Sequence, residues 1–87
     1  MRAVVTVIGK DTVGILAMVS GICAGANANV EEVTQSVLQD YYAMIMIVDI
    51  SKLNCEFSEF QSRMAANELG MTIHVMHEDI FNSMHRI

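Results

Sequence analysis

Two segments of this chain carry apolar side chains at both their odd-numbered and their even-numbered positions. Such a pattern restricts each segment to the interior of a β-sheet. The first spans residues 2–8 and reads RAVVTVI, and the second spans residues 43–50 and reads AMIMIVDI. Successive side chains of a strand point to opposite faces, so a strand that is apolar on both sets needs cover on both faces. We therefore predict that these segments are central strands of one sheet.

Two further segments predict strands of a different kind. Residues 30–38 carry Glu32, Thr34 and Ser36 on one alternating set, and this half-polar pattern is typical of a strand at a sheet edge. Residues 71–77 form the fourth predicted strand.

Three segments have the spacing of helices. The first spans residues 15–26, and the second follows Asn54, a candidate N-cap, and ends at Gly70 in the C′ position. The third is short and spans residues 79–85. Their predicted core residues are Ile15, Leu16, Val19, Ile22, Cys23 and Ala26, then Phe57, Phe60 and Met64, then Ile80, Phe81 and Met84.

The order of these elements, β-α-β-β-α-β, predicts an α+β fold of the ferredoxin-like kind. In that sandwich a four-stranded antiparallel sheet carries two helices on one face, here with a short additional helix at the C-terminus. The 87 residues are expected to form a single domain, 1–87. Two helices cover only one face, whereas the central strands are apolar on both, so something else must cover the second face.

The first helix carries no charge, because residues 15–28 contain no Asp, Glu, Lys or Arg. The side chains predicted on the outer side of this helix are all small: Ala17, Gly21, Ala24 and Ala28. Charged residues make up 17% of the chain, below the roughly 25% usual for soluble domains. We expect a homodimer or a higher homo-oligomer, paired through this helix and the edge strand or through the open sheet face.

Composition disfavours several other classes of function. The net charge is −5 and the basic residues are scattered, so no basic patch exists for nucleic acid. No apolar segment is long enough to span a membrane, and Cys23 and Cys55 are expected to be free, buried thiols in a reducing cytoplasm. The chain has no glycine-rich phosphate loop and no catalytic motif, so we expect neither a cofactor nor an enzyme. His74 and His77 point to opposite faces of a strand, which disfavours a shared metal ion.

A polar step separates the first strand from the first helix, at Lys10, Asp11 and Thr12. The N–H groups and the dipole of the following helix N-terminus favour an anion, and Gly14 leaves room for a ligand to approach. The alternative is that Thr12 or Asp11 simply caps the helix.

The segment VTVIGKDTVGILAMVSGICAGANANVEEVTQ resembles the opening half of an ACT domain, a βαββαβ module that senses small molecules. The resemblance rests on an apolar strand, the pattern Asp11-x-x-Gly14-Ile15, an apolar helix, and Ala28-Asn29-Val30 before the second strand. The rest of the chain resembles the stand-alone ACT proteins that lack an attached enzyme.

ACT domains typically pair, and an amino acid or other small metabolite binds between the paired domains. The resemblance implies a ligand site at Asp11, Gly14, Ile15 and Asn29, with Val30 lining it. The backbone N–H groups of Gly14 and Ile15 would bind a carboxylate, Asp11 an ammonium group, and Asn29 either group. The implied function is regulation of a separate enzyme or regulator; the alternative is a ligand-independent protein interaction module.

Overall fold

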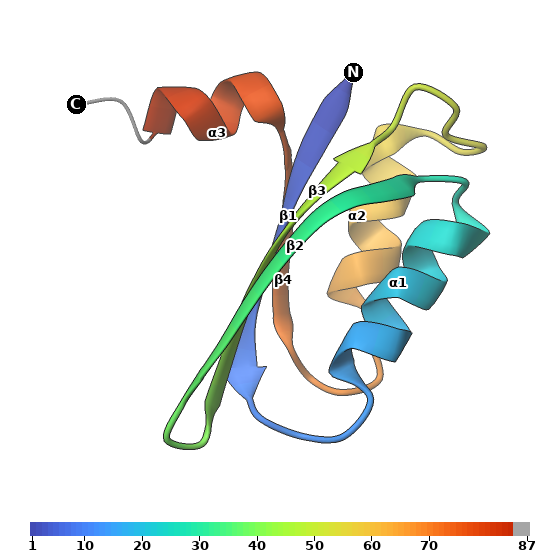
Figure 1. Cartoon of the computed structure of the whole chain (residues 1–87). Helices are drawn as coiled ribbons and strands as arrows, with labels where there is room; N and C mark the ends of the chain where they lie inside the picture. The colour runs from blue at the N-terminus through green and yellow to red at the C-terminus, as the bar shows by residue number, and fades with distance from the viewer. Residues whose placement is uncertain (85–87) are drawn as a thin grey trace.

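The chain forms a sheet with two helices packed on one face, and a computed structural model describes residues 1–84 (Figure 1). The elements are β1 (Arg2–Lys10), α1 (Ile15–Gly25), β2 (Asn29–Leu38), β3 (Tyr41–Asp49), α2 (Phe57–Ala65), β4 (Thr72–His77) and α3 (Glu78–Met84). The βαββαβ order and the additional short helix predicted from the sequence are confirmed.

The sheet is antiparallel, with strand order β2-β3-β1-β4. The two segments that are apolar on both sets, β1 and β3, occupy its centre as predicted, and the half-polar β2 is an edge. A bulge interrupts the pairing of β2 with β3 between Val30 and Glu32. Beyond it, Thr34 lies opposite Ile45, so the polar set of β2 faces away from the helices.

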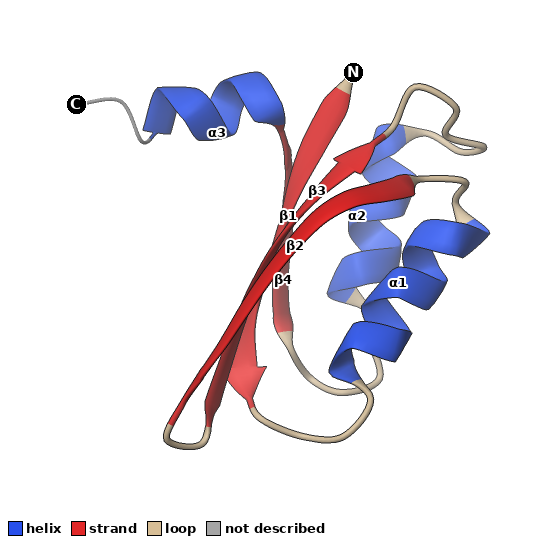
Figure 2. Ribbon diagram, viewed as in Figure 1, coloured by secondary structure: helices blue, strands red, loops and turns tan. Residues whose placement is uncertain are grey.

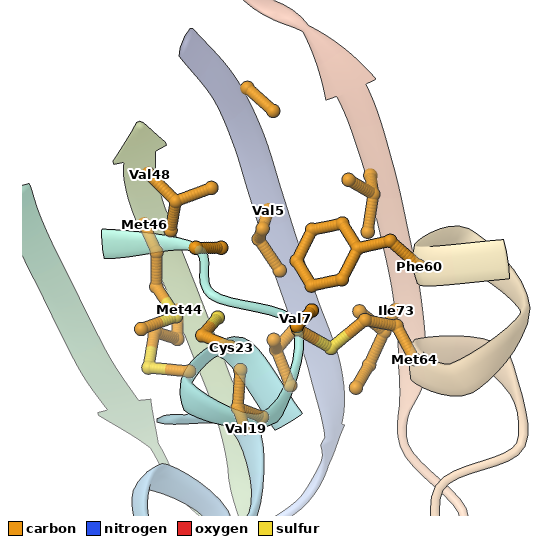
Figure 3. Close-up of a cluster of buried hydrophobic side chains, with 14 of the residues drawn as sticks. Val5, Val7, Val19, Cys23, Met44, Met46, Val48, Phe60, Met64 and Ile73 are labelled. Carbon is orange, nitrogen blue, oxygen red and sulfur yellow. The ribbon is translucent and has the colours of Figure 1, made fainter. Parts of the chain in front are cut away.

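The core fills the space between the sheet and the two helices, α1 and α2 (Figure 3). The Phe60 ring extends from α2 toward Val5 and Val7 of β1, and its burial stabilises the fold by roughly 1.5–3 kcal/mol. The other fully buried residues of this cluster include Val19, Cys23, Met44, Met46, Val48 and Met64.

The helix α1 differs from its prediction at two residues. Leu16 was expected in the core stripe but is 39% exposed, because the stripe that meets the sheet is narrower and runs through Ile15, Val19 and Cys23. Ala28 was expected on the outer side but is buried, because the helix ends at Gly25 and the chain turns inward before β2. The remaining small residues of the outer side are exposed: Ala17, Gly21 and Ala24.

Both predicted ends of α2 are wrong. The helix begins at Phe57 with Glu56 as its N-cap and ends at Ala65. Asn54 instead donates its side-chain N–H to the Gly25 carbonyl at 3.0 Å, which ties the loop before α2 to the end of α1. Gly70 lies in the turn before β4, where its positive φ of 68° favours glycine.

The second face of the sheet is covered at one end only. The helix α3 leaves β4 on the side away from α1 and α2 (Figure 2), and Arg2 of β1 forms an ion pair with Glu78 at its start. Val4 is buried there, whereas Ile8 and Ile45 are 55% and 43% exposed. Ile80, expected in the core, is 52% exposed, and Phe81 is half-buried. The Met84 side chain and residue 85 lie outside the part of the chain that the structure describes.

Candidate functional site

The loop of residues 11–14 presents an uncapped helix end. Gly14 is the N-cap of α1 in the left-handed conformation, with φ 90° and ψ 9°. No side chain in residues 1–84 caps this end, so the alternative of capping by Thr12 or Asp11 is wrong. The first N–H groups of a helix lack partners within it, and they carry the positive end of its dipole. A Cβ at Gly14 would have no neighbour within 4 Å, so the space beside Gly14 is open.

Asp11 lies in the loop three residues before Gly14, and its side chain is exposed. Its backbone N–H donates to the Asp40 carbonyl at 2.7 Å, which fixes the loop to the turn between β2 and β3. The Tyr42 side chain is buried nearby, and its hydroxyl donates to the Gln35 Oε1 atom. Burial raises the pKa of the Tyr42 phenol, and the negative charge of Asp11 raises it further.

Asn29 and Val30 border a different feature, a shallow depression of about 410 Å³ between α1 and the start of β2. Its other lining residues are Ser20, Ala24, Asn27 and Ala28. Asn29 is exposed and Val30 is half-buried, so both can contact a molecule in the depression.

The five predicted site residues therefore fall into two groups at opposite ends of α1 (Figure 1). Asp11, Gly14 and Ile15 lie together at its N-terminus, and Asn29 and Val30 lie together beyond its C-terminus. The helix has 11 residues and is roughly 16 Å long. One chain alone does not bring the two groups to one small ligand. The Ile15 side chain is buried in the core, so this residue offers only its backbone N–H.

The comparison with known proteins identifies the family. A family model described as ACT domain matches residues 2–76. The chain belongs to the ACT domain family. The family resemblance and the ferredoxin-like fold predicted from the sequence are thus confirmed.

This ACT domain is similar along its whole length to several UPF0237 proteins. A UPF0237 protein of Methanopyrus kandleri is 44% identical over 88 residues, which cover 99% of this chain and 98% of the relative. A UPF0237 protein of Listeria monocytogenes is 45% identical over 89 residues, with all of both chains covered. Among solved structures, an ACT domain protein from Streptococcus pneumoniae superimposes with a TM-score of 0.80 at 34% identity, covering 93% of each chain.

Sequence reasoning missed four residues around the two ends of α1 in this ACT domain. Tyr42 and Gln35 lie at the Asp11 end, and Ser20 and Asn27 line the depression beside Asn29. The sequence contained enough information to select Tyr42. A tyrosine whose side chain points from a central strand toward the helices needs a hydrogen-bond partner for its hydroxyl. The other three residues are polar, and nothing in their spacing marks them.

The two cysteines and the histidines His74 and His77 lie outside the two groups of predicted site residues. Cys23 and Cys55 are free thiols as predicted; Cys23 is buried, and burial raises its pKa to about 11, whereas Cys55 is only half-buried. His77 stacks on Phe57 at 4.2 Å between ring centroids, whereas His74 is exposed on the opposite face. Within residues 1–84, no three His, Cys, Asp or Glu residues are grouped to hold a metal ion. In the same residues, every helix is too short or too polar to cross a bilayer.

Substitution of Gly14 tests the loop conformation. Gly14→Ala is expected to lower the free energy of unfolding by roughly 1–2 kcal/mol, because the left-handed region crowds a Cβ against the backbone. Gly14→Asn should lower it less, since Asn tolerates this conformation. Urea unfolding of both variants measures the difference. Equal stability of Gly14→Ala and the wild type would contradict the left-handed N-cap.

Proposed function

We propose that this ACT domain binds an amino acid or a similarly small metabolite as a homodimer. The observation that carries the proposal is the uncapped N-terminus of α1, with the exposed Asp11 in the short loop that leads into it. Helix N–H groups complement a carboxylate, and an aspartate complements an ammonium group. A free amino acid carries both groups, so one ligand satisfies both partners.

A second copy of the chain supplies the missing half of the site. A two-fold axis that runs α1 antiparallel to the same helix of the partner brings Asp11 and Gly14 of one protomer to Asn29 and Val30 of the other. The symmetry then generates two identical composite sites, one at each end of the helix pair. This arrangement accounts for the separation of the two groups along α1 within one chain.

The surface on this side of the molecule favours that pairing. The outer side of α1 exposes Leu16, Ala17, Gly21 and Ala24, which are small or apolar and carry no charge. The edge strand β2 exposes Val33 and Val37 on the helix-facing side, opposite Met46 and Tyr42 of β3. The strand β2 pairs only with β3 in residues 1–84, so its outer edge has free N–H and C=O groups that a second β2 could pair.

Ligand binding between the protomers would favour one arrangement of the interface over another. A modest difference in ligand affinity between the two arrangements is enough to shift their populations, and a separate enzyme or regulator in the cytoplasm would respond to that shift. We propose no enzymatic activity for the chain itself. Burial raises the pKa of the Cys23 thiol to about 11, so this thiol is a poor nucleophile.

The interface is tested by placing a charge on α1. Ala24→Glu is expected to raise the Kd of the homodimer about 100-fold or more, because like charges in an interface cost several kcal/mol. Ala65→Glu, at an exposed position of α2, is the matched control and should leave the Kd unchanged. Sedimentation velocity across a range of concentrations measures both. A wild-type protein that stays monomeric throughout would contradict the interface.

The ligand is identified by thermal denaturation in the presence of each common amino acid. One amino acid should raise Tm, since a ligand at 100 times its Kd stabilises the fold by about 2.7 kcal/mol. Asp11→Ala and Asn29→Ala should each weaken that ligand at least about tenfold, as expected for loss of a charge-assisted hydrogen bond. Asp79→Ala, an exposed carboxylate of α3 on the other side of the sheet from α1, is the control. A screen without any response, from a protein that still dimerises, would favour the ligand-independent interaction module.

A further inference from the structure

The open face of the sheet carries a second concave surface, which the proposed amino-acid site does not use. We name it the sheet-face groove, and its volume is about 360 Å³. Its principal lining residues are Thr6, Ile8, Ile45, His74, Met76 and Phe81. The volume falls within the range of small-molecule sites, roughly 300–1,000 Å³.

The groove has a wall on one side and a polar border on the other. Phe81, half-buried on α3, forms the wall, and α3 projects over this face of the sheet (Figure 2). On the β2 side, Thr34 lies opposite Ile45 and Glu32 lies opposite Ile47. A flat second sheet laid across the whole face would bury the Glu32 carboxylate, which is costly without a partner. An occupant confined to the groove avoids that cost.

The polar groups of the groove are gathered at one place. Thr6 of β1 and His74 of β4 are directly opposite each other in the antiparallel pairing, and the other principal lining residues are apolar. Within residues 1–84, neither the Thr6 hydroxyl nor the His74 imidazole has a hydrogen-bond partner in the protein. No Asp or Glu of the described residues lines the groove, although the chain has a net charge of −5. The groove therefore combines an apolar body with two hydrogen-bond donors and no negative charge.

We propose that the sheet-face groove binds a small aromatic monocarboxylate. The ring lies between Phe81 and the side chains of Ile45 and Met76, where aromatic and thioether groups pack favourably on an aromatic ring. The carboxylate accepts hydrogen bonds from the Thr6 hydroxyl and the His74 imidazole. This site is on the opposite face of the sheet from α1, so it does not depend on the proposed amino-acid site.

The test is a titration of the ¹⁵N-labelled full chain with phenylacetate, followed by amide chemical shifts. Saturable shifts should centre on Thr6, Ile45 and His74, with a Kd of the order of 1 mM, the range expected for a fragment-sized ligand. Phenethylamine, which has a cationic group in place of the carboxylate, should bind at least about tenfold more weakly.

Three variants test whether the probes bind in the groove itself. His74→Ala should abolish the preference for phenylacetate over phenethylamine, and Ile45→Gln should weaken both probes at least about tenfold. Leu69→Gln is the matched control, since Leu69 is 37% exposed against 43% for Ile45 and lies outside the groove, and it should change neither. Circular dichroism confirms that each variant is folded.

Three results would overturn the proposal. One is the absence of saturable shifts, and another is equal binding of the two probes by the wild type. The third is an oligomer that Ile45→Gln dissociates, which would show that a second copy of the chain covers this face. Asp11→Ala should leave phenylacetate binding unchanged, so failure here and failure of the amino-acid site are distinguishable.

Discussion

The pairing of β1 between β3 and β4 is the interaction on which the rest of this structure depends. It runs from Arg2 to Lys10 along β3 and from Ala3 to Ile8 along β4. Because side chains alternate, this register places Val5 and Val7 under α1 and α2, and Thr6 and Ile8 on the opposite face. The same topology leaves β2 at the edge and carries α1 beside it. The central pairing therefore sets both the core and the surfaces that remain free.

Those free surfaces account for the two proposals. The edge strand β2 and the uncharged helix α1 lie on the same side of the molecule. A second copy of the chain could pair with the free backbone groups of β2 and cover the small, apolar surface of α1. The open face differs, because α3 covers only one end and β2 contributes polar residues there. We therefore assign pairing to the first surface and a small ligand to the second.

The sequence predicted the fold well because strand alternation and helix spacing report directly on burial, as β1, β3 and α1 show. It failed where a contact joins residues distant in the chain: Asn54 bonds to Gly25 across 29 positions, which no local capping rule anticipates. It also failed at Leu16, since spacing alone does not fix how wide a buried stripe is. For the candidate site, the family pattern selected Asp11 and Asn29 on either side of the predicted helix, but only the structure shows that one chain keeps them at opposite ends of α1.

The composite site is tested most directly by mixing Asp11→Ala and Asn29→Ala chains and measuring binding of the stabilising amino acid by calorimetry. In a mixed dimer, one site has lost both residues and the other is intact, because each site takes Asp11 from one protomer and Asn29 from its partner. Each variant alone should lack high-affinity sites, and the equimolar mixture should recover about one quarter of the wild-type binding capacity, as two-fold symmetry requires. A mixture that binds no better than either variant would contradict a site shared between protomers.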